Sequence, residues 1–315
     1  MPSARRIDVH FHVIPPFYRD AVYEAGTGPA IGRYPDWTPD LALELMDTHG
    51  IELAMTSLAQ PGVQLGTDES ARALARRCNE YAADLAARWP QRFGALATVP
   101  MGNMQHAVEE IAYCLDALEL DGVSLFASYG EKFLGDPRFD PVLEILDDRE
   151  AVVFIHPALH PSSRKLDLPW PGFMMEYLFD TTRAAVNLVF SGALERFPRI
   201  RFILAHAGGV MPYFAWRLSV SPMIDPRLPQ LSRAQVFAGL KNYWYDNALS
   251  PTAETMHALG PVALPDHVVF GSDWPFANAR VIAEAITTHT QSIPEPQRSA
   301  IDRRNAESLF PRLAR

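Results

Sequence analysis

Residues 6–12 read Arg6-Ile7-Asp8-Val9-His10-Phe11-His12, an apolar strand pattern that ends in two histidines two positions apart. Side chains two apart on a strand point to the same side, so His10 and His12 can face one ion. Later apolar runs end in the same way, since 152–155 is followed by His156, 200–205 by His206 and 268–272 by Asp273. This stretch therefore predicts a strand whose carboxyl end carries part of a metal site, with later strands supplying the rest.

Outward from this stretch, short β-branched runs alternate with longer helical stretches along the chain. The predicted strands are 5–10, 51–58, 93–99, 121–126, 151–156, 200–205, 242–246 and 267–271. The predicted helices lie near 39–49, 68–89, 104–118, 138–149, 173–196, 208–219, 252–259 and 277–290. Eight such pairs in 315 residues predict a single α/β domain that spans residues 1–315. We expect a distorted (β/α)8 TIM barrel rather than an open doubly wound sheet. No glycine-rich phosphate loop follows the first strand, which argues against a nucleotide fold.

Two stretches exceed the minimal barrel. Residues 13–37, inserted directly after the first strand, and 157–172, directly after His156, are rich in proline and aromatic residues. Long loops at the carboxyl ends of barrel strands build active-site walls, so we expect both to line the site; the alternative is that they only plug the barrel top. The tail, 295–314, is expected to form an amphipathic C-terminal helix that packs outside the barrel.

The composition describes an ordinary globular protein, with 48% hydrophobic and 21% charged residues. The formal net charge of −9, with scattered lysines and arginines, argues against nucleic acid or an anionic membrane as a partner. The N-terminus shows no secretory signal and no window reaches the ~18 apolar residues of a membrane span, so we expect a cytoplasmic protein. Cys78 and Cys114, both in predicted helices, are expected to be core thiols.

Imidazole and carboxylate groups are the ligands that divalent transition metals take, and zinc is commonly held by three or four of them. We therefore predict one divalent ion held by His10, His12, His156 and Asp273. A single histidine on an apolar strand is more often a hydrogen-bonded core residue, but four donors at separately predicted strand ends favour the metal site. His206 is followed by Ala207-Gly208-Gly209, which lets the backbone approach closely. It is predicted as an acid–base residue beside the metal, with a fifth ligand or a structural histidine as the alternatives.

These motifs resemble those of the amidohydrolase superfamily. The resemblance rests on Ile7-Asp8-Val9-His10-Phe11-His12, Phe154-Ile155-His156-Pro157, Ala205-His206-Ala207-Gly208-Gly209 and Gly271-Ser272-Asp273-Trp274-Pro275, and it extends to 180–184 and 304–306. More narrowly, the chain is similar to the branch of metal-dependent decarboxylases, which includes aminocarboxymuconate semialdehyde, γ-resorcylate and 6-methylsalicylate decarboxylases. The fourth predicted strand lacks the lysine that bridges two metals in many superfamily hydrolases, which implies a single metal. The histidine at position 10 favours Zn²⁺ over Mn²⁺, because some members have glutamate there.

The resemblance also implies roles for individual residues. The four predicted donors match the branch's metal ligands, and His206 matches its catalytic histidine. Arg217 matches an arginine that reaches into the neighbouring subunit and binds a substrate carboxylate, which implies a homodimer. The alternative is an ordinary surface arginine. Trp37 and Phe276 are candidate aromatic walls of the substrate site.

The activity that the resemblance implies is non-oxidative decarboxylation of a small hydroxylated aromatic acid, of salicylate or resorcylate type, or of a muconate-type acid. Asp273 is expected to protonate the carbon that loses CO₂, with His206 orienting the substrate, and the reverse assignment stays open. The main alternative is a metal-dependent hydrolase of an amide, ester or lactone on the same fold. A metal-free barrel that serves as a binding or scaffold protein is a third class.

Overall fold

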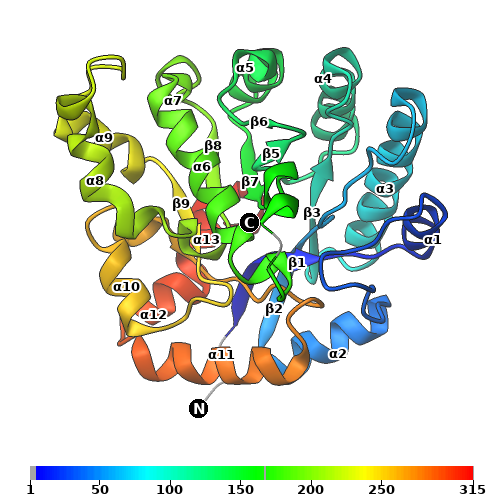
Figure 1. Cartoon of the computed structure of the whole chain (residues 1–315). Coiled ribbons are helices and arrows are strands. Elements are labelled where there is room, and N and C mark those ends of the chain that lie inside the picture. The colour runs from blue at the N-terminus through cyan, green and yellow to red at the C-terminus, as the bar shows by residue number, and fades with distance from the viewer. Residues whose placement is uncertain (1–4, 167, 315) are drawn as a thin grey trace.

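Eight parallel strands form the wall of a nearly closed barrel in the computed structural model, which describes residues 5–166 and 168–314 (Figure 1). In sheet order the strands are β1 (Arg6–His12), β2 (Ile51–Ser57), β3 (Phe93–Thr98), β4 (Gly122–Phe126), β7 (Val152–His156), β8 (Arg201–Leu204), β9 (Trp244–Asp246) and β10 (Val268–Val269). Each of the eight predicted strands is confirmed, and so is the distorted (β/α)8 barrel.

The first strand and the segment that follows the last strand close the barrel. The backbone N–H of His12 donates to the carbonyl of Trp274 at 2.7 Å, and that of Asp273 donates to the carbonyl of His10 at 2.8 Å. Nearer the amino end of β1, the N–H of Val9 donates to the carbonyl of Phe270 at 3.0 Å. These bonds place the carboxyl end of β1 beside residue 273, more than 250 positions away in the sequence.

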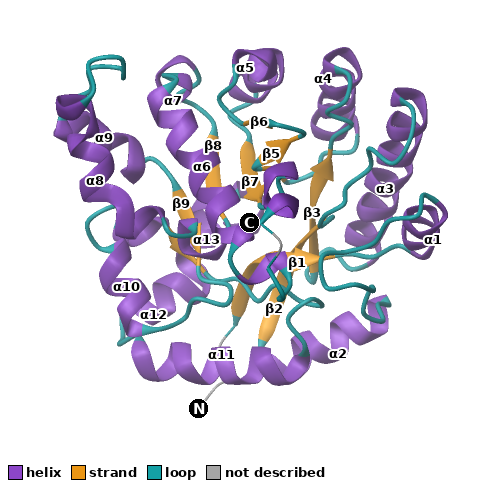
Figure 2. Cartoon of the chain, in the orientation of Figure 1, coloured by secondary structure: helices purple, strands orange, loops and turns teal. Residues whose placement is uncertain are grey.

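The helices form an outer ring around the strands (Figure 2). The helices that match the predicted ranges are α2 (Pro39–His49), α3 (Asp68–Arg88), α4 (Met104–Ala112), α5 (Asp140–Asp148), α6 (Glu176–Phe190), α7 (Ala193–Arg196), α8 (Met211–Ile224), α10 (Ala253–Leu259) and α11 (Ala279–Ser292). Helix α2 shows the local control clearly: the side chain of Thr38 accepts the N–H of Leu41 at 3.1 Å, and Gly50 ends the helix at a left-handed φ of 64°.

Some elements lie outside the predicted set. Helix α1 (Pro16–Glu24) forms within the stretch 13–37, and β5 (Ser128–Tyr129) pairs with β6 (Lys132–Phe133) in a short antiparallel hairpin after β4. Helix α9 (Arg233–Lys241) begins at a capping box of Ser232 and Gln235. The capping box is a sequence signal from which α9 could have been predicted. The strands β5 and β6 have two residues each, too few to show a hydrophobic periodicity.

The C-terminal tail is helical, as predicted, and it covers the amino-terminal end of the barrel from outside. It consists of α12 (Gln297–Ser299), the π-helical η7 (Ala300–Arg304), α13 (Asn305–Leu309) and the 3-10 turn η8 (Pro311–Ala314). The Nδ2 group of Asn305 donates to the carbonyl of Val268, the first residue of β10, at 2.7 Å. Leu309 and Phe310 are buried in one apolar cluster with residues of the strands such as Ile7. An amphipathic pattern marks an apolar face but does not identify its partner.

Both cysteines, Cys78 and Cys114, are buried and form no disulfide, as predicted. Burial raises the pKa of both thiols, so they stay protonated in the core. Within the described residues, no helix has the length and apolar character needed to cross a membrane.

Candidate metal centre

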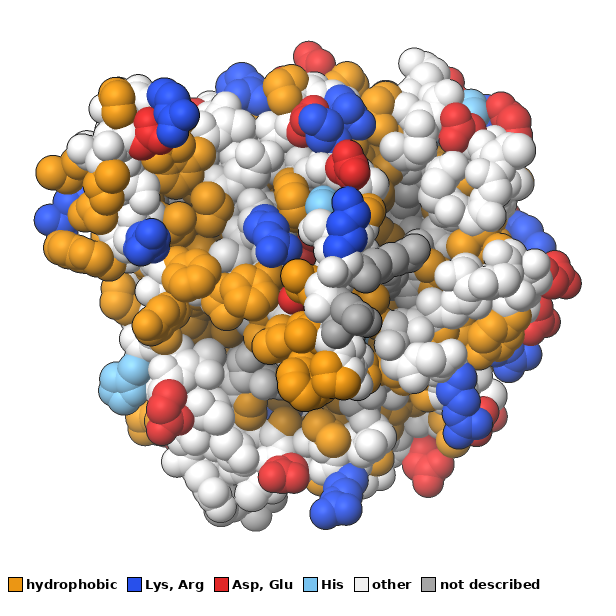
Figure 3. All heavy atoms as spheres, viewed as in Figure 1, with side chains coloured by type: hydrophobic (Ala, Val, Ile, Leu, Met, Phe, Trp, Pro, Cys, Tyr) orange, Lys and Arg blue, Asp and Glu red, His pale blue; other side chains and the backbone are white. Residues whose placement is uncertain are grey.

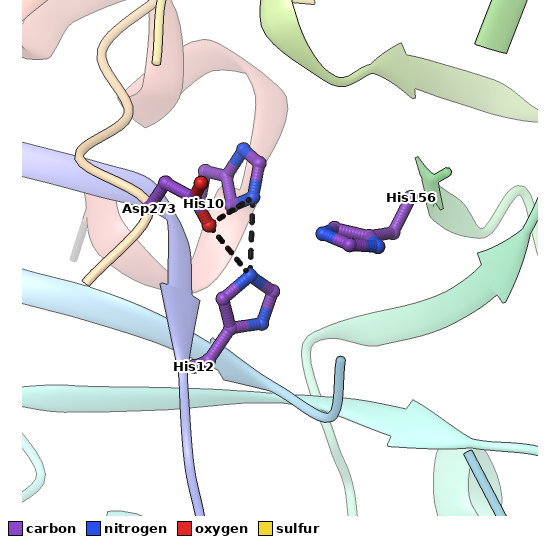
Figure 4. A group of neighbouring side chains, drawn as sticks. All are labelled: His10, His12, His156 and Asp273. Atoms are coloured by element: carbon purple, nitrogen blue, oxygen red, sulfur yellow. Dashed lines mark hydrogen bonds and ion pairs between the residues drawn. The ribbon is translucent and has the colours of Figure 1, made fainter. Parts of the chain in front are cut away.

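Four predicted donor residues converge at the carboxyl ends of the barrel strands (Figure 4). His10 and His12 come from β1, His156 is the last residue of β7, and Asp273 follows β10. One ligand atom of each residue lies within 4.8 Å of the others, and all four residues are buried. The group could therefore hold one metal ion.

Three of the donor atoms form a tight triangle. The Nε2 atoms of His10 and His12 lie 3.1 Å apart, and Oδ1 of Asp273 lies 3.2 Å from the first and 3.1 Å from the second. Donor atoms bound to one cation at about 2.0–2.2 Å are separated by about 3.0–3.4 Å. The triangle thus has the size that a single divalent transition metal requires, and the ring of His156 lies to one side of it (Figure 4).

The second ring nitrogen of each histidine faces an oxygen atom. Nδ1 of His10 lies 2.9 Å from Oδ2 of Asp246, and Nδ1 of His156 lies 2.8 Å from the carbonyl oxygen of Pro157. Nδ1 of His12 faces a carbonyl of β2 at 3.3 Å. A proton on Nδ1 satisfies these acceptors and leaves Nε2 as a lone pair for a metal. Three imidazole nitrogens and one carboxylate therefore fit a divalent transition metal.

Asp246 is the site residue that the sequence analysis missed. It ends β9 with no exposed surface, and besides His10 it binds two backbone N–H groups. Its Oδ1 accepts the N–H of His206 at 3.0 Å and that of Ala248 at 2.9 Å. Asp246 thus joins the first strand to the turn that carries His206. An aspartate at the end of the predicted strand 242–246 was the same signal that marked the four donors.

Burial and charge set the protonation of these groups. Burial alone would raise the pKa of Asp273, but His10 and the other adjacent histidines hold it well below its usual value. Burial lowers the pKa of His12 and His156. Burial also opposes the charged form of His10, but the carboxylates of Asp246 and Asp273 outweigh it and raise the pKa of His10 to about 10. Because a ligand must be deprotonated, binding of a cation at His10 releases a proton.

His206 lies beside the four donors. Its Nε2 is 3.6 Å from Oδ2 of Asp273, and its buried Nδ1 has no hydrogen-bond partner among the described residues. Asp273 therefore directs Oδ1 toward the two histidines of β1 and Oδ2 toward His206. His206 and Asp273 both have left-handed backbones, at φ 54° and 63°. Such conformations are uncommon outside glycine and persist where the surrounding structure holds them.

A cavity of about 340 Å³ lies against His156, His206 and Asp273. This volume is within the range of small-molecule sites. The stretch 13–37 contributes Pro29, Ala30 and Ile31 to the wall, as expected. The described residues of the stretch 157–172 do not line the cavity, and the wall on that side comes from the segment that follows it, including Phe173, Met174, Tyr177 and Leu178.

The predicted substrate-binding residues lie in different surroundings. Phe276 lines the cavity, with its ring 5.3 Å from that of His12. Trp37 does not line the cavity. It is buried, and the centroid of its ring lies 6.4 Å from that of Trp274. Arg217 is exposed on α8 and does not line the cavity of its own chain. Among the described residues that form the wall, none is lysine or arginine.

Known proteins resemble this chain over nearly its whole length. The family described as Amidohydrolase matches residues 7–312. The chain is 37% identical over 314 residues to a 6-methylsalicylic acid decarboxylase of Penicillium expansum, covering 98% of this chain and 97% of that protein. It is 31% identical over 287 residues to a gamma-resorcylate decarboxylase of Rhizobium radiobacter, covering 86% of each. A crystal structure of 2,6-dihydroxybenzoate decarboxylase complexed with 2,6-dihydroxybenzoate superimposes with a TM-score of 0.81 at 26% identity, over 98% of this chain and 99% of that one.

Proposed function

Because this chain belongs to the amidohydrolase family, we propose that it is a metal-dependent, non-oxidative decarboxylase of a small hydroxylated aromatic acid. The observation that carries the proposal is the convergence of four metal-donor residues beside a cavity of small-molecule size. The relatives named as salicylic and resorcylate decarboxylases support this activity over a hydrolase of an amide, ester or lactone.

We propose that His10, His12, His156 and Asp273 hold one divalent cation, Zn²⁺ in preference to Mn²⁺. Three imidazole nitrogens and a single carboxylate are a donor set that suits zinc, whereas manganese favours sites richer in oxygen. When bound, the cation supplies a Lewis acid that polarises the carboxylate and hydroxyl oxygens of the substrate.

We propose that Asp273 donates the proton and that His206 orients a substrate oxygen. Oδ2 of Asp273 faces His206 and Oδ1 faces the other donors, so a proton on Oδ2 leaves Oδ1 available as a ligand. Burial would raise the pKa of Asp273, but the adjacent histidines lower it, so Asp273 is ionised in the free protein and takes up this proton only when the substrate acid is bound. The ring carbon that bears the carboxylate gains this proton; the bond to the carboxylate then breaks, and its electron pair restores the ring as CO₂ leaves. His206 as the donor is the alternative, because it lines the same cavity.

The wall of the cavity favours an aromatic acid with an apolar substituent. Most of the wall is apolar, with Ile31, Phe173, Leu249 and Phe276 among its side chains, whereas Gln60, Tyr177 and Ser250 supply polar groups. A second hydroxyl group placed against the apolar part of this wall would lose its hydrogen bonds to water without gaining a partner. We therefore favour an alkyl-substituted salicylate over a resorcylate or a muconate-type acid.

We further propose a homodimer in which Arg217 binds the carboxylate of a substrate held by the other subunit. Arg217 lies on α8 with two large side chains, Tyr213 and Trp216, that are 84% and 61% exposed. Hydrophobic side chains gather over α8 and α9 on the face in Figure 3, and an apolar patch of this kind is typical of a protein contact. The lack of lysine and arginine among the described wall residues also supports a charge from outside the subunit.

Turnover of salicylate-type acids with zinc and with manganese tests the proposed function. We expect CO₂ release, with no ¹⁸O from labelled water in the aromatic product. The hydrolase alternative predicts uptake of ¹⁸O when an amide, ester or lactone is supplied. Full activity in protein with less than about 0.1 equivalent of metal per chain would contradict the metal centre.

A further inference from the structure

His156 is held differently from the other three donor residues. The donor atoms of His10, His12 and Asp273 contact one another at 3.1–3.2 Å, and dashed lines join all three in Figure 4. No such line reaches His156 in Figure 4. Its donor nitrogen lies within 4.8 Å of the other three donor atoms but forms no hydrogen bond or ion pair with them. The direction of the His156 ring is set by its packing against neighbouring rings such as Tyr177 and by the hydrogen bond from its Nδ1 to the loop that follows it.

A single peptide group connects His156 to a buried carboxylate. Its carbonyl, on Pro157, accepts the Nδ1–H of His156 at 2.8 Å. Its N–H, on Ala158, donates to Oδ2 of Asp180 at 2.8 Å. Because a peptide group is planar, a partner that fixes the N–H also fixes the direction of the C=O.

Asp180 is itself firmly held. It lies on α6 with no exposed surface, and the hydroxyl of Ser128 lies 2.9 Å and 3.1 Å from its two oxygens. The carboxylate thereby ties α6 to the segment after β4 and to the loop after β7. A buried carboxylate is costly unless it is well hydrogen-bonded, and bonds to an ionised acceptor are among the strongest.

We propose that Asp180 is a positioning residue of the metal centre: it orients the Pro157–Ala158 peptide so that His156 keeps its proton on Nδ1 and directs Nε2 at the cation. The inference rests on the proposed metal centre. Asp180 belongs neither to the four donors nor to the residues that line the cavity, so it acts through the peptide alone. Its charge also polarises that peptide and makes the carbonyl a better acceptor for His156.

Zinc affinity, measured by competition with a chromophoric chelator, tests the positioning role. Groups that orient a ligand typically change metal affinity 10–100-fold, so we expect Asp180→Ala and the shorter Asp180→Ser to bind zinc about tenfold more weakly. Asp180→Asn keeps an oxygen that can accept from Ala158, and we expect it within about threefold of the wild type. Ser128→Ala is the matched control, because it removes the hydroxyl that contacts both oxygens of Asp180 but leaves the carboxylate and its bond from Ala158 in place, and we expect a change of about twofold at most.

The tautomer of His156 in metal-free protein gives a second measurement. With ¹⁵N-labelled histidine, we expect the wild type to show His156 as the Nδ1–H form and Asp180→Ser to show a mixture of tautomers, in protein whose circular dichroism is unchanged. If the Asp180→Ala variant does not fold, the zinc affinity and the His156 tautomer of the Asp180→Ser variant test the inference.

Three results would overturn the inference: zinc binding within twofold of the wild type in Asp180→Ser, an unchanged His156 tautomer in that variant, or an Asp180→Asn variant as weak as Asp180→Ser. A wild type that binds no zinc would instead refute the proposed function, and the tautomer measurement would still decide the role of Asp180.

Discussion

Replacing Asp246 by asparagine is expected to switch His10 from the Nδ1–H tautomer to the Nε2–H tautomer. Both residues lack exposed surface, and Oδ2 of Asp246 lies 2.9 Å from Nδ1 of His10. Its Oδ1 accepts two backbone N–H groups, from His206 at 3.0 Å and Ala248 at 2.9 Å. Asparagine must present an oxygen on one side and an NH₂ group on the other. Leaving the two backbone donors unpaired would cost about 1–3 kcal/mol each. The oxygen therefore stays with them, and the NH₂ group faces His10.

His10 must then accept at Nδ1 and carry its proton on Nε2. That atom lies 3.1 Å from Nε2 of His12 and 3.2 Å from Oδ1 of Asp273, so the proton points into the donor triangle. A protonated nitrogen cannot bind a metal. We expect zinc affinity to fall about 10–100-fold, the range seen for groups that orient metal ligands. This corresponds to about 1.4–2.8 kcal/mol of binding free energy.

Chelator competition measures the zinc affinity, and thermal unfolding reports whether the Asp246→Asn variant is folded. Asp147→Asn is a suitable control, since Asp147 is also a buried carboxylate that accepts a backbone N–H, from Arg199 at 2.7 Å, but lies outside the donor group and the cavity wall. Its zinc affinity is expected to equal that of the wild type. A folded Asp246→Asn variant that binds zinc as tightly as the wild type would refute the tautomer argument.

His206→Ala and Asp273→Asn are each expected to preserve the fold, by circular dichroism, and to lower the rate of CO₂ release by on the order of 10²-fold or more. A near-normal rate in either variant would remove that residue from the mechanism. Trp216→Glu puts a charge on the exposed face of α8, and sedimentation is expected to show a monomer where the wild type is a dimer; an unchanged dimer would show that this face is not the interface. Burial raises the pKa of Asp180 from 3.8 to about 6. The folded state therefore holds that proton more tightly than the unfolded chain, so the contribution of Asp180 to stability is complete below pH 3.8 and is lost as pH rises through about 6. The loss amounts to about 3 kcal/mol at 1.36 kcal/mol per pH unit. Urea unfolding of Asp180→Asn and wild type from pH 4 to 8 should show the variant gaining stability relative to the wild type, and parallel curves would contradict this.

Most of the barrel could be predicted from local sequence because each strand and helix carries its own periodicity. The strand 152–156 is an apolar run that stops at His156, and the helix 39–49 has a cap at Thr38 and a left-handed glycine at its end. The short β5–β6 hairpin has no such periodicity. The partner of the C-terminal tail could not be predicted, because its apolar residues, including Leu309 and Phe310, would suit any apolar surface, and only the assembled barrel offers its amino-terminal end for them to cover.

By itself, the sequence determined the order of strands and helices and the donor residues at the strand ends, since both depend on neighbouring positions. The carboxyl ends of parallel strands lie at the same end of a barrel, so donor residues at separate strand ends are expected to come together there. Only the tertiary structure decided how they meet: the closure that sets Asp273 against His10, the bond from Asp246 to His10, and the peptide between His156 and Asp180. These partners are separated along the chain and no local pattern encodes their distances, because a hydrogen bond between them exists only after the barrel has closed.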